Sequence, residues 1–177
     1  MFGIVFIDDN LIFSWSEDEH VEHLRIVLQI LEDWELYAKC SKCEFWLRFF
    51  AFLCHIISSE GIQVYPKNTN MVKNWPRPLS ASDIQSFLGL TGYYRKFVEG
   101  FSYVASPLMT LTQKKVKFLW SEACEKNFQE LKNKLTPAPI LTLIEGSDGF
   151  VVYCDASQIG LGFVLMQHGK IISYASR

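Results

Sequence analysis

Two adjacent carboxylates, Asp8 and Asp9, interrupt an apolar stretch, VFIDDNLIF, near the beginning of the 177-residue sequence. Two like charges about 4 Å apart near a protein surface repel each other by about 4 kcal/mol. Carboxylate oxygens are also the ligands that hard divalent cations such as Mg²⁺ take in proteins. The stretch therefore indicates either a metal-binding site or an ordinary Asp-Asp-Asn turn between two strands.

A third carboxylate, Asp155, directly follows the uncharged run FVVYC. Such a run predicts a buried strand. An aspartate at the end of a strand is more often a turn residue than a ligand. Taken alone, Asp155 is therefore only a candidate for chemistry.

The apolar pattern predicts the element that would position the first pair. Residues 2–7 and 11–15 are rich in strand-forming side chains, and the turn-favouring residues 8–10 between them predict a β-hairpin. Neighbouring side chains on a regular strand point to opposite faces. We therefore expect Asp8 and Asp9 to approach one site at the turn.

Helical and further strand segments follow the hairpin. The sequence SEDE at 16–19 is a capping signal and predicts a helix that ends near Leu36. The aromatic and aliphatic residues 45–58 predict one or two strands. Three prolines in residues 66–78 predict a hinge into a second unit, with a short helical piece inside it.

The rest of the chain is predicted to be helical and then extended. Ser80 caps a helix that carries Gly89 and Gly92, and each glycine costs about 1 kcal/mol relative to alanine. We therefore expect another backbone to pack closely against that helix. Ser121 caps a later helix, and three strands are predicted from residue 150, the last two joined by the turn HGK. The apolar face of the later helix comprises Cys124, Phe128, Leu131 and Leu135.

The charges are distributed unevenly along the chain. Residues 1–60 carry 4 basic and 11 acidic side chains, residues 61–120 carry 8 and 2, and residues 121–177 carry 5 and 6. An acidic part with an aspartate pair, followed by a basic part, suits metal ions and then a polyanion. Ordinary surface variation between two domains is the alternative.

Composition limits the class of protein. An apolar share of 49% is ample for a packed core. No apolar run approaches the ~20 residues needed to span a bilayer, and the start MFGIVFIDD lacks the features of a signal peptide. The sequence therefore predicts an intracellular chain without a membrane partner.

The five cysteines favour reduced thiols, because their number is odd and their spacing irregular. CSKC is a single CxxC, and Cys54-His55 follows it, but a strong zinc signal would need a second pair at finger-like spacing. Cys54 lies in FAFLCHII, which predicts a buried strand. Core cysteines are therefore favoured over a zinc site.

These stretches also resemble a known family. FIDD resembles the Y/F-x-D-D box of reverse transcriptases, and seven further stretches follow in the family's order. These are SKCEFW, FLCHIISSEGI, NWPRP, FLGLTGYYRKFVEGFS, PLMTLTQK, FLWSEACEKNFQELKNKL and VVYCDASQIGLGFVLMQHGKIISYASR. Eight boxes in order are specific, and over essentially its whole length the chain resembles the pol polyprotein of gypsy-type LTR retrotransposons.

The resemblance implies an α+β chain in three regions. Residues 1–57 resemble the C-terminal part of a reverse-transcriptase palm with its primer-grip hairpin, and residues 58–115 resemble a helical thumb. Residues 116–177 resemble a connecting helix and the N-terminal strands of an RNase H-like α/β domain. The implied activities of the intact family are RNA-directed DNA polymerisation and hydrolysis of the RNA strand of RNA–DNA hybrids.

The resemblance also assigns catalytic and metal-binding roles to the three aspartates. Asp8 is the expected direct metal ligand, Asp9 has a supporting role, and Asp155 is the first carboxylate of an RNase H site. Each site would use two Mg²⁺ (or Mn²⁺) ions for phosphoryl transfer or hydrolysis. The family's other carboxylates are expected upstream of Met1 and downstream of Arg177, so the isolated chain is expected to be inactive.

Nucleic acid is the expected partner, as RNA template, DNA primer and RNA–DNA hybrid, together with the remaining parts of the polyprotein. Backbone contacts with a duplex need cations. The nucleic-acid-binding candidates are His55, Lys67, Lys73, Arg77, Arg95, Lys96, Lys114, Lys115 and Lys117. Tyr93 and Tyr94 could line the duplex, although core packing is favoured for at least one of them.

Two positions depart from the family's pattern. Cys54 stands where the family usually has glycine in its primer grip, and Tyr65 stands where it commonly has an acidic residue before proline. Localisation by resemblance is cytoplasmic or within virus-like particles. A non-catalytic nucleic-acid-binding remnant and an unselected pseudogene product are the alternative functions.

Overall fold

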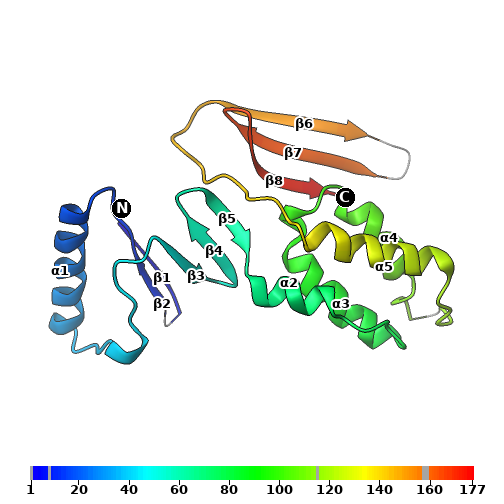
Figure 1. Ribbon diagram of the computed structural model, residues 1–177, viewed down its shortest axis with the longest axis horizontal. Helices are drawn as coiled ribbons and strands as arrows, with labels where there is room; N and C mark the ends of the chain where they lie inside the picture. The colour runs from blue at the N-terminus through cyan, green and yellow to red at the C-terminus, as the bar shows by residue number, and fades with distance from the viewer. Residues whose placement is uncertain (1, 8, 115, 157–159) are drawn as a thin grey trace. The chain divides into compact units, whose positions relative to one another are not determined.

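The computed structural model describes residues 2–7, 9–114, 116–156 and 160–177. They form two compact units, Met1–Leu47 and Arg48–Arg177 (Figure 1). The described residues form helices and three separate antiparallel sheets, which confirms the α+β class. No helix among these residues is long and apolar enough to cross a bilayer.

The first unit begins with a hairpin of β1 (Gly3–Phe6) and β2 (Asp9–Ile12). The register pairs Phe6 with Asp9, so the chain reverses between these two residues. Asp9 therefore belongs to the second strand and not to the predicted turn, because Ile7 takes a positive φ of 53° and starts the reversal earlier. Asp8 lies outside the described residues.

Helix α1 (Glu17–Asp33) begins at the predicted cap, where the Ser16 hydroxyl accepts a hydrogen bond from the Glu19 amide at 3.2 Å. It ends before the predicted Leu36, because Glu35 takes a left-handed φ of 55°. None of its residues is buried. A 3₁₀ turn, η1 (Cys40–Lys42), follows it.

The second unit opens with a sheet of β3 (Phe49–Phe52), β4 (His55–Ser58) and β5 (Gly61–Val64). The sequence predicted at most two strands here. The third strand, β5, pairs with a distant segment, because Ile62 and Leu141 exchange backbone hydrogen bonds of 2.7 and 2.9 Å. Gly61 permits this approach, since a Cβ on it would collide with the Leu141 carbonyl oxygen.

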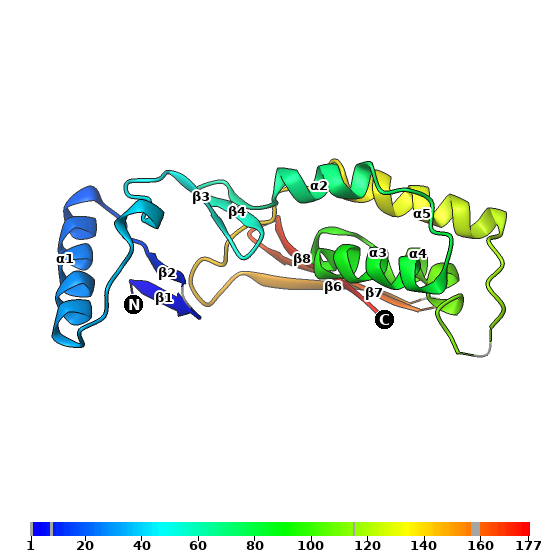
Figure 2. The ribbon, with the colours of Figure 1, turned by 90° about the horizontal axis from the view of Figure 1, so that it is seen from below.

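Four helices and one 3₁₀ turn follow, and Figure 2 shows α3 beside α4 and α2 beside α5. They are α2 (Pro66–Lys73), α3 (Ala81–Tyr93), η2 (Arg95–Phe97), α4 (Phe101–Thr110) and α5 (Glu122–Leu135). The predicted cap of α3 is confirmed as a capping box, in which Ser80 and Asp83 each bond the backbone amide of the other.

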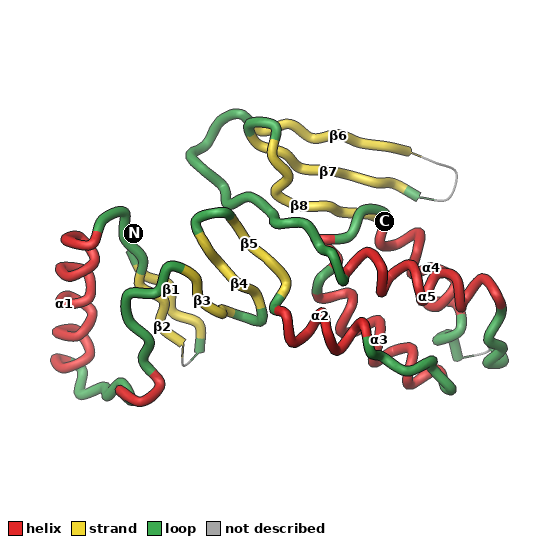
Figure 3. Tube along the Cα trace, viewed as in Figure 1, coloured by secondary structure: helices red, strands yellow, loops and turns green. Residues whose placement is uncertain are grey.

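The last sheet contains β6 (Phe150–Ala156), β7 (Leu161–Gln167) and β8 (Lys170–Ser176), as three predicted strands (Figure 3). Strand β8 lies against η2 and α4. The Ser102 amide donates to the Ser176 hydroxyl, and the Ser102 hydroxyl donates to the Ser176 carbonyl, both at 2.9 Å. Strand β6 was predicted to be buried but is exposed throughout, because it lies at the edge of the described sheet and no described helix packs extensively on its faces.

One hydrophobic core joins the helices of the second unit. The rings of Phe87 on α3 and Phe128 on α5 lie 4.7 Å apart between centroids, and both side chains are buried. The predicted face of α5 is confirmed, since Cys124, Phe128, Leu131 and Leu135 are all buried. Val72 of α2 is buried in the same core, although its segment was predicted to be a hinge.

Two expectations about small residues were wrong. Nothing lies within 4 Å of a Cβ placed on Gly89, and Gly92 faces the Phe101 ring at 3.9 Å, so no other backbone packs there. Among the five cysteines, all of them described, only Cys124 is buried. Cys40, Cys54 and Cys154 are exposed, in a 3₁₀ turn, a hairpin turn and strand β6, and Cys43 is half-buried.

Helix α2 offers a test of its N-cap. Tyr65 occupies that position and its side chain makes no capping hydrogen bond, whereas aspartate there would accept one from a first-turn amide. We expect Tyr65→Asp to exceed Tyr65→Ala in free energy of unfolding by about 1 kcal/mol, measured by urea denaturation. Equal stability of the two variants would contradict this account of the cap.

Candidate functional site

Asp9 is the member of the aspartate pair that the structure describes. Its side chain is exposed at the start of β2, and its backbone pairs with Phe6. An exposed carboxylate fits Mg²⁺ or Mn²⁺ as one hard oxygen ligand. Among the residues described, no three His, Cys, Asp or Glu side chains are arranged to hold an ion. Asp9 is therefore at most one contributor to a metal site.

Asp155 lies within β6, not at its end as predicted, because the register continues to the pair Ala156–Leu161. Its partner across the strands is Gly162, which has no side chain to cover the carboxylate. Asp155 is exposed as well. Its oxygens are free to serve as ligands of a hard cation.

The β3–β4 hairpin ends in an unusual turn. Its register pairs Phe52 with His55, so Leu53 and Cys54 form the turn, with φ values of 46° and 59°. A two-residue turn with positive φ at both positions is the type that Asn-Gly normally makes. Each non-glycine residue in this conformation costs about 1–2 kcal/mol. Cys54 is exposed at this turn, so the buried position predicted for it was wrong.

Two tyrosines at the end of α3 bond to this turn. The Tyr93 hydroxyl donates to the Leu53 carbonyl at 2.7 Å, and the Tyr94 hydroxyl donates to the Cys54 carbonyl at 3.0 Å. Burial raises the pKa of both hydroxyl groups, so both remain protonated donors at neutral pH. Tyr94 is 1% exposed and packs in the core, whereas Tyr93 is 51% exposed.

His55 lies inside the protein behind the turn and is 8% exposed. Its Nδ1–H donates to the Leu53 carbonyl at 2.7 Å, and Nε2 is buried without a hydrogen-bond partner among the described residues. Burial lowers the pKa of His55, and the charge of Lys96 adds to the effect, so the ring is neutral at pH 7. Its ring therefore faces protein, not solvent.

A second exposed feature is one face of α3. Gln85, Gly89 and Tyr93 follow one another at i, i+4 and i+8, and Ser86 adjoins them. The face carries small or uncharged side chains and ends at the hairpin turn. This face was not predicted from the sequence, because its residues carry no charge, although their i, i+4 spacing places them on one side of a helix.

The basic candidates are spread over several segments. Lys67 and Lys73 lie on α2, Arg77 follows it, Arg95 and Lys96 belong to η2, and Lys114 and Lys117 lie in the loop before α5. Lys115 lies outside the described residues. Arg77 already has partners within the chain. Its Nε lies 3.7 Å from a Glu125 carboxylate oxygen, and its guanidinium lies 5.4 Å from the Trp120 ring centroid. Lys96 is half-buried, and burial lowers its pKa.

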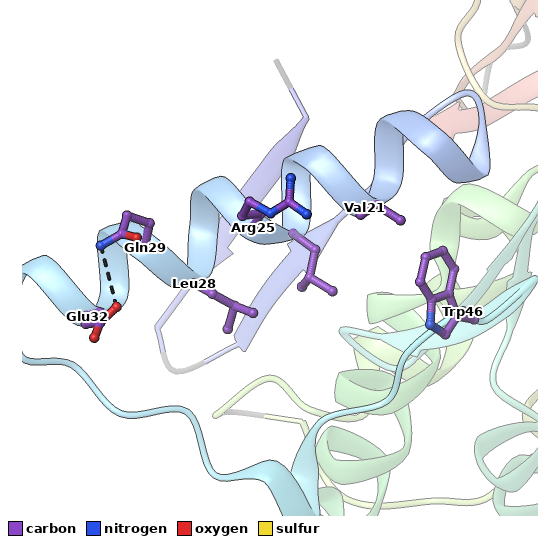
Figure 4. Close-up of a pocket in the computed structure, with 7 residues that line it drawn as sticks. Val21, Arg25, Leu28, Gln29, Glu32 and Trp46 are labelled. Atoms are coloured by element: carbon purple, nitrogen blue, oxygen red, sulfur yellow. Dashed lines mark hydrogen bonds between the residues drawn. The ribbon is translucent and has the colours of Figure 1, made fainter.

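The first unit has a shallow apolar groove that Asp9 does not line. Val21, Leu24 and Leu28 of α1 form it together with Trp46 (Figure 4). Gln29 and Glu32 at its rim are joined by a hydrogen bond of 3.5 Å. No candidate catalytic residue lines the groove, so it is separate from the carboxylate chemistry.

Comparisons with known proteins cover the whole chain. A family model described as reverse transcriptase (RNA-dependent DNA polymerase) matches residues 1–121, and one described as RNase H-like domain found in reverse transcriptase matches residues 120–177. The chain is 37% identical over 176 residues to the retrovirus-related Pol polyprotein from transposon 297 of Drosophila melanogaster. It is 33% identical over 164 residues to the transposon Tf2-3 polyprotein of Schizosaccharomyces pombe.

These alignments span 98% and 93% of the chain but only 16% and 12% of the two polyproteins. Among solved structures, the foamy viral protease-reverse transcriptase in complex with double-stranded DNA matches with a TM-score of 0.90 and 25% identity. The match covers 99% of this chain and 32% of that one. The complex of that viral protein with RNA/DNA hybrid matches with a TM-score of 0.85 and 26% identity, over 99% and 24% of the two chains.

The buried His55 predicts a pH-dependent stability. Its pKa in the folded protein is below the unfolded value of about 6.5, so the unfolded chain binds the proton more readily. Stability from this residue is present above about pH 6.5 and is lost as the pH falls towards the folded pKa. We expect His55→Phe, which keeps the aromatic packing, to lose less stability between pH 7.5 and 5.5 than the parent chain.

The measurement is urea denaturation at the two pH values. His168→Gln, at an exposed position in the β7–β8 turn, is the matched control and should retain the parent's pH response. An unchanged response in His55→Phe would show that another group is responsible.

Proposed function

Because this chain belongs to the reverse transcriptases, as the reverse transcriptase/RNase H region of a retrotransposon pol polyprotein, we propose that it holds a primer–template duplex. In this proposal residues 1–57 are palm, residues 58–115 are thumb, and residues 116–177 begin the RNase H domain. The two solved structures matched above are complexes with double-stranded DNA and with RNA/DNA hybrid. Both kinds of duplex are the proposed ligands of this chain.

One observation carries the proposal: the exposed, uncharged face of α3 ends at the tip of the β3–β4 hairpin. Gly89 leaves open space at the middle of that face. A duplex backbone can approach a glycine more closely than any other residue. Gln85 and Ser86 supply hydrogen-bonding groups on the same face, and Tyr93 supplies an aromatic ring at its end.

Electrostatic attraction would come from cations of the neighbouring elements. Arg95, which is exposed, and Lys96, which is half-buried, follow Tyr94 at the end of α3. Lys67 and Lys73 are exposed on α2. Lysine and arginine contacts with phosphates position a duplex without reading its sequence. The proposed binding is therefore independent of base sequence and sensitive to salt.

Asp8 and Asp9 are the proposed palm ligands, and Asp155 is the proposed first ligand of the RNase H site. Divalent ions bound there would stabilise the charge that develops on the transferred or hydrolysed phosphoryl group. The protein's own part is to present exposed carboxylate oxygens, at the first residue of β2 and opposite Gly162 in β6.

We infer that the 177 residues alone incorporate no nucleotide, since they match only 16% and 12% of the two polyproteins. Primer extension with Mg²⁺ that Asp8→Asn abolishes would contradict this inference. A non-catalytic nucleic-acid-binding remnant is the second candidate function, favoured by the same incompleteness. An unselected product of a degenerate copy would show no specific duplex binding.

Duplex binding tests the proposal. In fluorescence anisotropy with an RNA–DNA hybrid, we expect affinity to fall about 100-fold between 50 and 200 mM salt, as about four phosphate contacts predict. Arg95→Gln should weaken binding and lower the salt slope by about 1. Lys126→Gln, an exposed charge on α5 outside the proposed surface, is the control. A flat salt response, or no binding at low salt, would defeat the proposal.

Substitutions at Gly89 distinguish an effect on duplex affinity from an effect on the free energy of unfolding. A Cβ at this position meets nothing within 4 Å, the residue is exposed and leucine has a higher helix propensity, so we expect Gly89→Leu to be as stable as the parent or up to about 1 kcal/mol more stable. The same side chain would block the approach of a duplex, and affinity should fall at least about tenfold. Gly89→Ala should fall between the two, and unchanged binding by Gly89→Leu would exclude this face as the contact.

A further inference from the structure

We propose that Tyr93 and Tyr94 are positioning residues, whose hydroxyl groups hold the Leu53–Cys54 turn on the end of α3. The hairpin and the exposed face of α3 then present one continuous surface. Contacts within the chain support the claim that the tyrosines hold the turn. The claim that this favours duplex binding rests on the proposed function.

The first argument is the turn itself. Leu53 and Cys54 both have positive φ, which residues with a side chain rarely adopt. The strands β3 and β4 that flank the turn have four residues each. β3 is an edge strand that pairs with β4 alone within the described three-stranded sheet, and strands this short provide little stability by themselves. Local sequence therefore does not account for this turn, and contacts from elsewhere must hold it.

The second argument is where those contacts come from. Both turn carbonyls accept hydrogen bonds from residues 40 positions later in the chain, from Tyr93 to Leu53 and from Tyr94 to Cys54. The Leu53 carbonyl also accepts from His55 Nδ1, so both of its lone pairs are used. The Cys54 carbonyl also accepts the Tyr65 amide at 3.3 Å. Each carbonyl of the turn thus has two donors.

The third argument is that the tyrosines are themselves held in place. The two rings contact each other edge to face, with centroids 5.0 Å apart. Asn68 of α2 donates from Nδ2 to the Tyr94 hydroxyl oxygen at 2.5 Å. His55 fills the space behind the turn, with its ring 5.4 Å from that of Tyr93 and 5.5 Å from that of Tyr94. The two hydroxyl groups are therefore fixed donors.

The exposed atoms of this arrangement lie where the proposed ligand would dock. Tyr93 is 51% exposed and Leu53 is 37% exposed. Tyr93 is also the last residue of the uncharged face of α3. The hydroxyl group that bonds the turn thus belongs to a ring at the end of the proposed duplex-binding surface. Without that bond, the turn and the helix face could move separately.

The test removes only the hydroxyl groups. The double variant Tyr93→Phe/Tyr94→Phe keeps both rings, and Tyr103→Phe, an exposed tyrosine on α4, is the matched control. Amide hydrogen exchange of the 177-residue chain is measured by segment. We expect residues 52–56 to exchange about 30-fold faster in the double variant, as the loss of two net hydrogen bonds predicts. The amides of α5 and those of the control should be unchanged.

A second measurement tests the positioning role. Affinity for the RNA–DNA hybrid should fall about fivefold in the double variant, and adding Cys54→Gly, which relieves the turn, should restore most of the loss. Unchanged exchange at residues 52–56 would overturn the proposed anchoring. Faster exchange with unchanged affinity would overturn the positioning role. If the parent binds no duplex, the proposed function fails, and the exchange result alone decides the anchoring.

Discussion

The packing of α3 against α4 and α5 is the constraint on which the second unit depends. Phe87 and Phe128 meet at its centre, and β5 and the segment around Leu141 are bonded to each other at its edge. Helix α3 can expose one uncharged face only because its opposite face is fixed in this core. Of the tyrosines that reach the hairpin turn, Tyr93 is the last residue of the same helix and Tyr94 is its C-cap. The candidate interface is thus an extension of the core.

The chemistry of the turn and the burial of His55 are linked. A neutral imidazole can lie behind the turn and donate one hydrogen bond, whereas a charged one would have to be buried beside the charge of Lys96. The hydroxyl groups of Tyr93 and Tyr94 are suited to the same place, because a phenol is protonated at neutral pH and burial raises its pKa further. Neutral hydrogen-bond donors thus hold the strained Leu53–Cys54 turn, and no charged donor has to be buried behind it.

The sequence predicted the elements whose signals are local. Ser16, Ser80 and Ser121 marked helix starts, and the apolar period predicted the buried face of α5. It could not predict β5 or the turn at Cys54, because both depend on partners far along the chain, Leu141 and Tyr94. The predicted burial of β6 was wrong for a related reason, since a run of apolar residues does not reveal whether another element covers it.

The contact between Phe87 and Phe128 has a consequence for how such elements evolve. The two family models meet at residues 120 and 121, immediately before α5, yet α5 shares its core with α3 and α4. The boundary between the sequence families is therefore not a boundary between folding units. Recombination or truncation at that junction would separate two halves of one core, so the segments on its two sides are constrained to be inherited together.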